Sequence, residues 1–409
     1  MSLPVNLRAV AGAVSAAAGL IAVGAAAGVV AERSVVGKTP RADSEAEEPF
    51  GRLRSAPIVV DSDGIQIHVE VEECTRANPE NLTVVFCHGY SLNQDCWHYQ
   101  RRDLKALGRL VFWDQRSHGR SARSVAETNT IEQLGRDLYA VLEAVVPAGP
   151  VVLVGHSMGG MTIMQFALDH PELLGSRVRG VALLSTSPGG LREVGLGLPD
   201  FAARPLHRLL PVTTAVLTRN ADLVEMGRSR ANDLSLLLTR RYSFGSNVAP
   251  AVAEFTHRML NDTSIGVISE FLPTLQAHDR HRSLKVLSKV PVLLMVGLDD
   301  RMTPAEHTRE MASRMPDAEL VLVPDAGHMM ILEHYGRVNH QLRRLVAQVR
   351  DELAVPPDNT SAGGREAASE TEPAVGTPAG PGPGAGVGSG PGVEAAAGIG
   401  SGAEPGAGQ

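Results

Sequence analysis

The segment Pro150–Leu168 constrains the fold of this chain more than any other part of the sequence. A β-branched, apolar run of strand length, Val151–Val154, leads into Gly155-His-Ser-Met-Gly159, and an apolar segment of helical length follows at once. This G-x-S-x-G pattern is typical of a sharp strand-to-helix turn that raises a serine hydroxyl above the edge of a sheet. The same pattern also occurs in turns without chemistry. The hypothesis that Ser157 is a nucleophile therefore depends on partners elsewhere in the chain.

The composition gives no sign of a nucleic-acid-binding, disulfide-rich or metal-binding protein. The chain has 409 residues and a formal net charge of −7, and its Lys and Arg residues are not clustered, so nothing indicates a nucleic-acid surface. Three cysteines are too few for a disulfide framework, although a disulfide between Cys74 and Cys96 stays open as an alternative. Cys87 ends an apolar run and is expected to be buried. No His, Cys and Asp spacing indicates a metal site, and no motif requires a cofactor.

The N-terminal part of the chain contains a long uncharged run, residues 9–31. As a helix it would extend about 34 Å, which is enough to cross a bilayer. The run is rich in Ala and Gly, so three alternatives stay open: a membrane anchor, a cleaved signal peptide and a helix outside the membrane. The first predicts a membrane-associated protein, whereas the others predict a secreted or a cytoplasmic one.

The central part of the chain has the pattern of an α/β domain. An antiparallel pair of strands is expected first, and from Leu82 short apolar strands alternate with helical segments. This pattern predicts a mostly parallel eight-stranded sheet with helices on both faces. The expected strands are Pro57–Val60, Ile65–Val71, Leu82–Cys87, Leu110–Trp113, Val151–Val154, Val181–Ser185, Val292–Val296 and Leu320–Val323, and the expected helices include Trp97–Leu107, Ile131–Val145 and Met158–Leu168.

The shifts in composition predict six segments. Between the two parts of the α/β core lies a Leu-rich stretch with several prolines and no clear strand, which favours a helical lid over the sheet edge. The segments are a hydrophobic N-terminal helix (1–34), a polar linker (35–56), the first part of the core (57–188), the helical lid (189–287), the second part of the core (288–354) and a disordered Pro/Gly/Ala-rich tail (355–409).

Two polar motifs downstream of Ser157 could supply the base and acid that a serine nucleophile requires. Asp299 and Asp300 follow one expected strand, and His328 follows the next. Because the carboxyl ends of parallel strands meet at one edge of a sheet, we expect these side chains to lie near Ser157.

An oxyanion hole is expected from two backbone N–H groups near Ser157. The loop His88-Gly89-Tyr90 ends a further strand and can direct the N–H of Tyr90 at a reacting carbonyl. The second donor would be the N–H of Met158. Trp97 and Tyr99, which follow this loop, either line an acyl pocket or pack in the core.

From about Pro57 to Leu353 the chain resembles the α/β-hydrolase superfamily, of the type with a helical lid. The motifs that carry the resemblance are His88-Gly89, Asp114–Ser121, Gly155–Gly160, Gly297–Pro304 and Gly327-His328. The resemblance implies that Ser157 is the nucleophile, that His328 is the general base and then the acid, and that an aspartate orients His328. The family pattern G-x-x-D-x-x-x-P, counted from Gly297, favours Asp300 over Asp299 for this role.

These motifs together predict a serine hydrolase that cleaves a carboxylic ester or a related acyl bond through an acyl-enzyme, without cofactor or metal. The expected partner is a small, hydrophobic acyl substrate, and the oligomeric state stays open. Acyl transfer to an alcohol, hydrolysis of C–C bonds, lactones or amides, and cofactor-free perhydrolysis are alternatives on the same triad. A rival from another class is a non-catalytic, tethered binding protein that keeps the fold.

Overall fold

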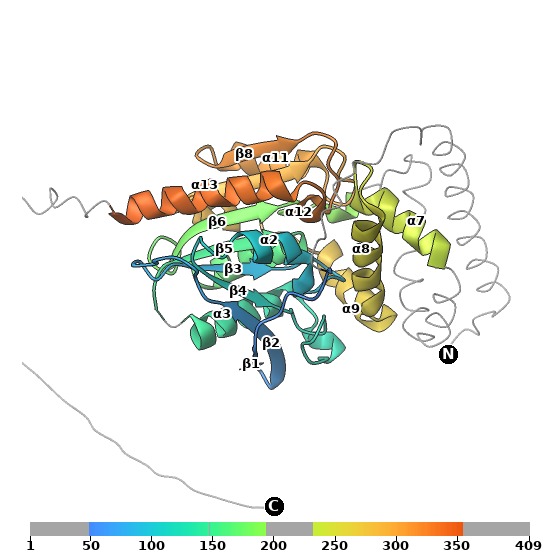
Figure 1. Cartoon of the computed structure of the whole chain (residues 1–409), viewed down its shortest axis with the longest axis horizontal. Helices are drawn as coiled ribbons and strands as arrows, with labels where there is room; N and C mark the ends of the chain where they lie inside the picture. Colours follow the sequence, from blue (N-terminus) through green and yellow to red (C-terminus); the bar gives the residue numbers. More distant parts are fainter. Residues whose placement is uncertain (1–48, 147, 194–231, 355–409) are drawn as a thin grey trace, which may run out of the picture. The chain divides into compact units, whose positions relative to one another are not determined.

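The computed structural model describes residues 49–146, 148–193 and 232–354, which contain an eight-stranded sheet (Figure 1). The strand order is β1-β2-β4-β3-β5-β6-β7-β8, with β1–β2 and β2–β4 antiparallel and the other neighbours parallel. The predicted fold class is therefore confirmed. The strands are β1 (Pro57–Ser62), β2 (Ile65–Glu72), β3 (Thr83–Cys87), β4 (Arg109–Trp113), β5 (Val151–His156), β6 (Val178–Leu184), β7 (Val292–Gly297) and β8 (Glu319–Val323).

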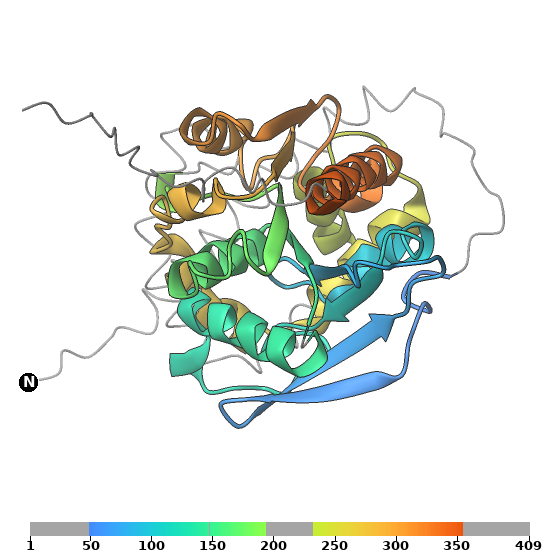
Figure 2. The same ribbon diagram turned by 90° about the vertical axis from the view of Figure 1, so that its left-hand side faces the viewer.

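The central strands are buried on both faces, and their side chains alternate between two hydrophobic layers. In β3, Val84 and Phe86 belong to one layer while Val85 and Cys87 belong to the other, as the two-residue period of a strand requires. Figure 2 shows the long orange-red helix α13 on one side of the sheet, with α3 and α4 on the other. The first layer includes α2 (His98–Asp103), α12 (Met330–Glu333) and α13 (Tyr335–Ala354), and the second includes α3 (Ile131–Val145), α4 (Met158–Asp169), α10 (Ser283–Leu287) and α11 (Ala305–Arg314).

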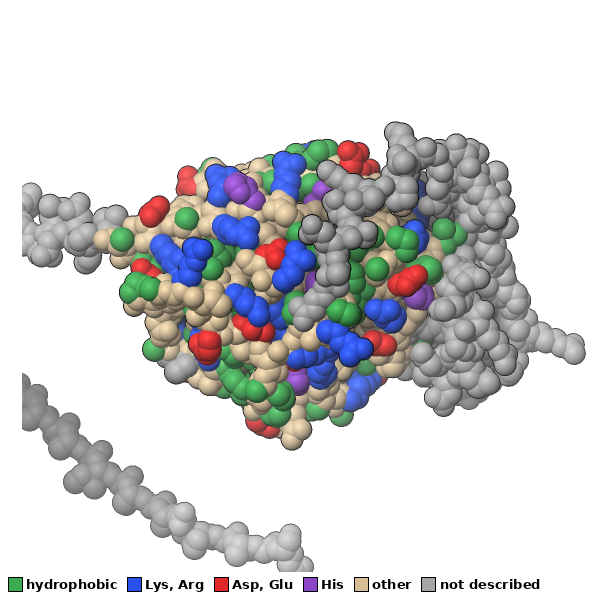
Figure 3. Space-filling model, in the orientation of Figure 1, with side chains coloured by type: hydrophobic (Ala, Val, Ile, Leu, Met, Phe, Trp, Pro, Cys, Tyr) green, Lys and Arg blue, Asp and Glu red, His purple; other side chains and the backbone are tan. Residues whose placement is uncertain are grey.

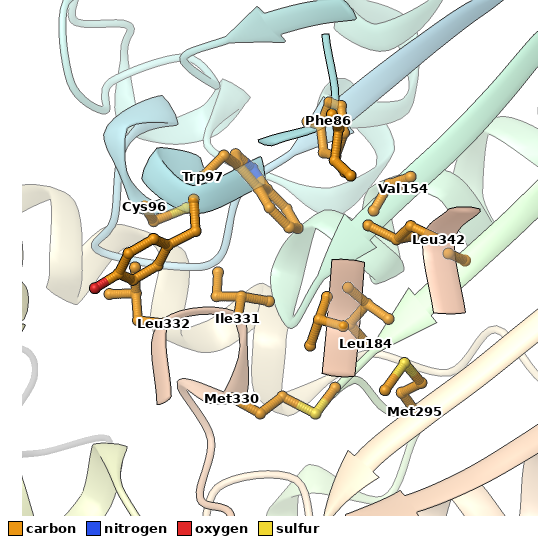
Figure 4. Packing of buried hydrophobic residues seen from close by; sticks show 14 of the residues in the cluster. Phe86, Cys96, Trp97, Val154, Leu184, Met295, Met330, Ile331, Leu332 and Leu342 are labelled. Carbon is orange, nitrogen blue, oxygen red and sulfur yellow. The ribbon is translucent and has the colours of Figure 1, made fainter. Parts of the chain in front are cut away.

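The helix expected over Trp97–Leu107 is shorter than predicted. A 3-10 turn, Gln94–Trp97, is followed by α2, which ends at Asp103 because the chain has to turn into β4 at Arg109. Trp97 is fully buried in the core against Phe86, with ring centroids 5.1 Å apart (Figure 4). Tyr99 stacks on Tyr335 at 3.7 Å. Of the two alternatives for these aromatic residues, core packing is the one observed.

The insertion between β6 and β7 is helical in its described part, residues 189–193 and 232–287. It contains the 3-10 turn Leu191–Glu193 and helices α7 (Asn232–Ser243), α8 (Pro250–Asp262) and α9 (Ile265–Gln276) before α10. A β-bridge between Gly189 and Asp279 joins two distant points of this insertion. Phe244 and Phe255 extend the first hydrophobic layer, so this end of the insertion packs on the core.

The prediction of a membrane-associated protein requires correction. Across residues 49–146, 148–193 and 232–354, no helix has both the length and the apolar character needed to span a membrane. The uncharged run 9–31, on which that prediction depended, lies outside the described residues, as does the predicted tail 355–409.

The three cysteines carry free thiols, so the pair left open between Cys74 and Cys96 does not form. Cys87 is fully buried in β3, as expected, and burial raises the pKa of its thiol to about 12. A thiol with so high a pKa is not a nucleophile at neutral pH.

Positive and negative side chains are mixed on one face of the described part of the molecule. On the face shown in Figure 3, Lys and Arg side chains lie among Asp, Glu and apolar ones. Exposed ion pairs among the described residues include Arg309–Glu306, 3.1 Å, and Arg314–Glu310, 2.9 Å. Pairs of this exposed kind stabilise a fold by about 0–1 kcal/mol each.

The buried carboxylate of Glu70 ties the segment before β1 to the sheet. Its Oε2 accepts hydrogen bonds from the Ser55 N–H, 2.9 Å, and from Arg101 Nη1, 2.7 Å. Arg101 also donates to the carbonyl of Leu53, 2.7 Å. Burial alone would raise the pKa of Glu70, but the hydrogen bonds from His68, Ser55 and Arg101 outweigh it and lower the pKa to about 2.

Glu70 should therefore contribute to the pH dependence of stability. Because its folded-state pKa is depressed, its contribution is present above pH 4.5 and is lost as pH falls toward about 2. The upper value of this contribution is about 3 kcal/mol. Urea unfolding at several pH values should show Glu70→Gln less stable than wild type at pH 7 and less sensitive to acid. Glu319→Gln, which removes only an exposed pair with Arg344, should leave the pH profile unchanged.

Candidate active site

Ser157 occupies a strained backbone conformation between β5 and α4, with φ 53° and ψ −119°. The flanking glycines permit this turn. A Cβ atom at Gly159 would lie 2.0 Å from the carbonyl oxygen of Cys87, and one at Gly155 would lie 2.6 Å from the backbone of Gly159. Strain of this kind costs about 1–3 kcal/mol and is found mainly at functional sites. The turn leaves Ser157 at the start of α4, where N–H groups are free to bind an anion.

Two hydrogen bonds fix the serine turn to the end of the neighbouring strand β6 and to the segment that follows it. The N–H of Ser157 donates to the carbonyl of Leu184, 3.0 Å, and Thr186 Oγ1 donates to the carbonyl of Ser157, 2.7 Å. Thr186 is fully buried. Both backbone polar groups of Ser157, its N–H and its carbonyl, are therefore held by hydrogen bonds.

Asp300 and His328 lie in contact at the carboxyl ends of β7 and β8. His328 Nδ1 is 2.9 Å from Asp300 Oδ2 and 3.1 Å from Oδ1. Asp300 is 4% exposed, whereas Asp299 is exposed and its N–H bonds to the carbonyl of Ala326. The structure thus brings Asp300, of the two candidate aspartates, to the histidine.

Backbone and hydroxyl donors complete the shell around Asp300. Its Oδ1 accepts from the N–H groups of Met302 and Thr303, both at 2.9 Å, and its Oδ2 accepts from Thr303 Oγ1, 2.8 Å. Burial alone would raise the pKa of Asp300, but His328 and Thr303 hold it below its ordinary value. The carboxylate therefore stays ionised, and it accepts the proton on His328 Nδ1 in a hydrogen bond.

That hydrogen bond fixes the tautomer of a neutral His328, so Nε2 carries the lone pair that a base needs. Within the described residues, Ser157 Oγ makes no hydrogen bond to His328 Nε2. Catalytic hydrogen bonds are often long in unliganded enzymes and tighten when substrate binds.

His156, the residue before the serine, links the turn to the histidine loop. It is fully buried, its Nε2 donates to the carbonyl of His328 at 2.9 Å, and the two rings are 4.9 Å apart. Burial lowers the pKa of His156 to about 3, so the ring stays neutral at physiological pH. The hydrogen bond holds the backbone of His328 beside the serine turn.

The loop after β3 runs beside Ser157. A Cβ atom at Gly89 would lie 3.2 Å from the Cβ of Ser157. His88 fixes this loop: its Nε2 accepts from the N–H of Gln115, 2.9 Å, and its Nδ1 therefore donates to the carbonyl of Gly89, 2.8 Å. Burial lowers the pKa of His88 to about 4, which keeps this hydrogen-bond pattern at neutral pH.

The two N–H groups expected to form an oxyanion hole are available as donors. Across the described residues, neither the N–H of Tyr90 nor that of Met158 has a hydrogen-bond acceptor. The Tyr90 side chain is fixed by another contact, because its hydroxyl donates to the carbonyl of Ile268 in α9. The insertion therefore holds the loop that carries one of these donors.

The surroundings of this loop are apolar on the side of the insertion. A buried cluster joins the start of α4 to α3 and α9, and Tyr90 packs against it. Its members are Ile131, Leu134, Met158, Met161, Val267, Phe271 and Leu275. In the described part of the chain, no group of three or more His, Cys, Asp or Glu side chains could hold a metal ion.

Sequence reasoning missed three contributors to this arrangement: Thr303, Thr186 and Glu333. Thr303 follows Asp300 by three residues, which is the spacing of a carboxylate that caps its own turn and could have indicated its role. Glu333 accepts from the N–H of Gly327, 2.7 Å, and no local pattern indicates this contact. The role of Thr186 depends on the pairing of β5 with β6.

Replacement of Gly159 tests the turn geometry. Gly159→Ala would force its Cβ into the carbonyl of Cys87, so we expect a loss of stability of about 2 kcal/mol or more, or failure to fold. Thermal unfolding would measure it. Gly336→Ala is the matched control, because a Cβ there meets nothing within 4 Å at the start of helix α13, and it should be neutral or slightly stabilising. Equal behaviour of the two variants would contradict the tight turn.

A family model described as "Alpha/beta hydrolase family" matches residues 84–341. This match includes Ser157, Asp300 and His328.

Two bacterial proteins are similar to this chain in sequence. The AB hydrolase superfamily protein YisY of Bacillus subtilis (strain 168) is 26% identical over 271 residues, which cover 66% of this chain and 91% of the relative. A pimeloyl-(acyl-carrier protein) methyl ester esterase of Xanthomonas oryzae pv. oryzae (strain MAFF 311018) is 27% identical over 218 residues, which cover 52% of this chain and 76% of the relative.

Solved structures share the fold at low sequence identity. A thermophilic esterase from Thermogutta terrifontis matches with a TM-score of 0.54 and 22% identity, covering 72% of this chain and 99% of that one. Est816, described as an N-acyl homoserine lactone degrading enzyme, matches with a TM-score of 0.54 and 24% identity, covering 70% and 99%. At these identities the similarity shows the fold alone.

Proposed function

Since the chain belongs to the alpha/beta hydrolase family, we propose that it is a serine hydrolase that cleaves a carboxylic ester or a related acyl bond. The observation that carries the proposal is the contact between His328 Nδ1 and the buried carboxylate of Asp300, 2.9 Å, at the sheet edge that holds Ser157. A serine hydroxyl is a weak nucleophile until an oriented base removes its proton.

In the first half of the reaction, Ser157 Oγ attacks the substrate carbonyl carbon while His328 Nε2 takes the hydroxyl proton. Asp300 holds the ring and stabilises the imidazolium that forms. The imidazolium then gives its proton to the leaving alcohol, which departs and leaves an acyl group on Ser157. In the second half, His328 takes a proton from water as the water oxygen attacks the acyl carbon. The imidazolium then returns this proton to Ser157 Oγ as the bond to the acyl carbon breaks and the free acid leaves.

The N–H groups of Tyr90 and Met158 would stabilise the oxyanion that forms on the carbonyl oxygen. Their lack of an acceptor among the described residues supports this role, because a donor already paired within the protein would be unavailable. Fixed donors of this kind typically contribute about 3 kcal/mol each to the transition state. The hydrogen bonds of His88 would keep the Tyr90 peptide in place as charge develops.

We expect the acyl group of the substrate to be apolar, because the loop of Tyr90 packs against the buried apolar cluster that includes Met161, Val267 and Phe271. A relative is named as a methyl ester esterase, and a structural neighbour is described as degrading an N-acyl lactone, so both an open ester and a lactone are substrate classes to test. A panel of p-nitrophenyl esters of increasing chain length, with lactones and amides, would separate them. Product analysis with a competing alcohol would show mainly free acid from a hydrolase and mainly ester from an acyltransferase.

An activity-based fluorophosphonate probe tests the nucleophile. The full-length protein should be labelled at Ser157, with the site identified by mass spectrometry, because the hydroxyl is activated by His328. Ser157→Ala should not be labelled, whereas Ser187→Ala, which replaces a buried serine three residues after β6, should still be labelled. Failure to label the wild type, or equal labelling of Ser157→Ala, would contradict the proposed function.

Substitution of two neighbouring aspartates tests which of them orients His328. Asp300→Asn should lower kcat for a p-nitrophenyl ester by about 100-fold or more, because the amide can present its N–H to Nδ1 and favour the wrong tautomer. Asp299→Asn should stay within about twofold of wild type, since Asp299 is exposed and its backbone makes the observed contact. The reverse result would assign the acid to Asp299.

A further inference from the structure

Glu333, at the end of α12, bridges two segments that are far apart in the sequence. Its Oε2 accepts from the N–H of Gly327, 2.7 Å, directly before His328. Its Oε1 accepts from the N–H groups of Gly245, 3.0 Å, and Ser246, 2.5 Å, and from Ser246 Oγ, 2.7 Å. One carboxylate therefore joins the loop of the candidate base to the segment that follows α7 of the insertion.

The backbone of the insertion lies directly on the histidine loop at this point. A Cβ atom at Gly327 would lie 2.5 Å from the carbonyl carbon of Phe244. On the other side of His328, the N–H of Met329 donates to the carbonyl of Ser243, 2.7 Å. His328 is thus flanked on both sides by residues whose N–H groups are tied to residues 243–246, directly or through Glu333.

From these contacts we infer that Glu333 is a positioning residue, which couples the docking of residues 243–246 to the placement of His328. The inference rests on the proposed function, in which His328 is the base. Charge-assisted hydrogen bonds are about twice as strong as neutral ones, and four converge on this carboxylate. Displacement of a catalytic group by about 1 Å can lower the rate by about 100-fold.

The chemistry of the carboxylate explains why its neutral analogue would fail. An ionised carboxylate has acceptors on both oxygens, so it can receive N–H groups from two directions. In Glu333→Gln, one of the two positions becomes an NH₂ donor that faces another N–H donor. The variant can therefore keep the contact to Gly327 or the contact to Gly245 and Ser246, but not both.

The experiment combines hydrogen–deuterium exchange with kinetics on Glu333→Gln, Ser246→Ala and the control Glu306→Gln. Among the described residues, Glu306 forms an exposed ion pair with Arg309 on α11. Ser246→Ala removes one hydroxyl donor on the insertion side and leaves the contact of Glu333 with Gly327 intact. It also keeps the question answerable if Glu333→Gln fails to fold.

Coupling predicts a change at the histidine loop even when the insertion side alone is altered. Both Glu333→Gln and Ser246→Ala should speed exchange in peptides that cover residues 326–329. Labelling of Ser157 by the fluorophosphonate should slow, about 10- to 100-fold for Glu333→Gln and less for Ser246→Ala. For a p-nitrophenyl ester, kcat should fall while KM changes less than about twofold. Glu306→Gln should match wild type in each measurement.

Three results would overturn the inference. Exchange at 326–329 that is unchanged in Ser246→Ala would show that Glu333 holds each segment separately. Faster exchange with unchanged labelling and kcat would show a purely structural role. A fall in kcat accompanied by an equal rise in KM would point to substrate binding. Wild-type protein that is not labelled at Ser157 would instead overturn the proposed function, and the exchange data alone would then decide whether the segments are coupled.

Discussion

The backbone of Ser157 is the constraint on which the candidate site depends. Ser157 has a positive φ, and Gly159 lets the first turn of α4, directly after it, approach the carbonyl of Cys87. That approach brings the loop after β3, which carries the proposed oxyanion donor Tyr90, beside the proposed nucleophile Ser157. The turn is also held by hydrogen bonds to Leu184, the last residue of β6, and to Thr186 in the segment that follows it.

Two buried histidines, His88 and His156, act as neutral hydrogen-bonding groups. His88 holds the loop after β3, and His156 holds the backbone of His328. Desolvation lowers the pKa of both, so neither changes charge near neutral pH. His328 differs because its Nδ1 meets a carboxylate that can stabilise a positive ring. In the proposed reaction His328 is therefore the ring that takes part in proton transfer, while His88 and His156 hold the backbone around it.

The sequence predicted those features that are local in the chain. Strand ends and the serine turn follow from short patterns, and Asp300 with His328 follows from their positions after β7 and β8. The pattern could not show that Glu333 reaches Gly245, because that contact depends on how the insertion packs. It also could not decide between pocket and core for Trp97, since an aromatic side chain next to a loop fits both. The predicted membrane association failed because an uncharged Ala- and Gly-rich run has a composition shared by several kinds of segment.

The insertion is attached to the core at two loops of the candidate site, at Ile268 through the Tyr90 hydroxyl and at Gly245 and Ser246 through Glu333. It is therefore not a freely exchangeable module. A chimaera that replaced residues 189–287 with the corresponding segment of a relative would have to supply a carbonyl for Tyr90 and N–H donors for Glu333. Recombination within this family should then preserve function when the insertion and the two loops that it contacts come from one parent. A chimaera should therefore be joined at points that do not separate these partners.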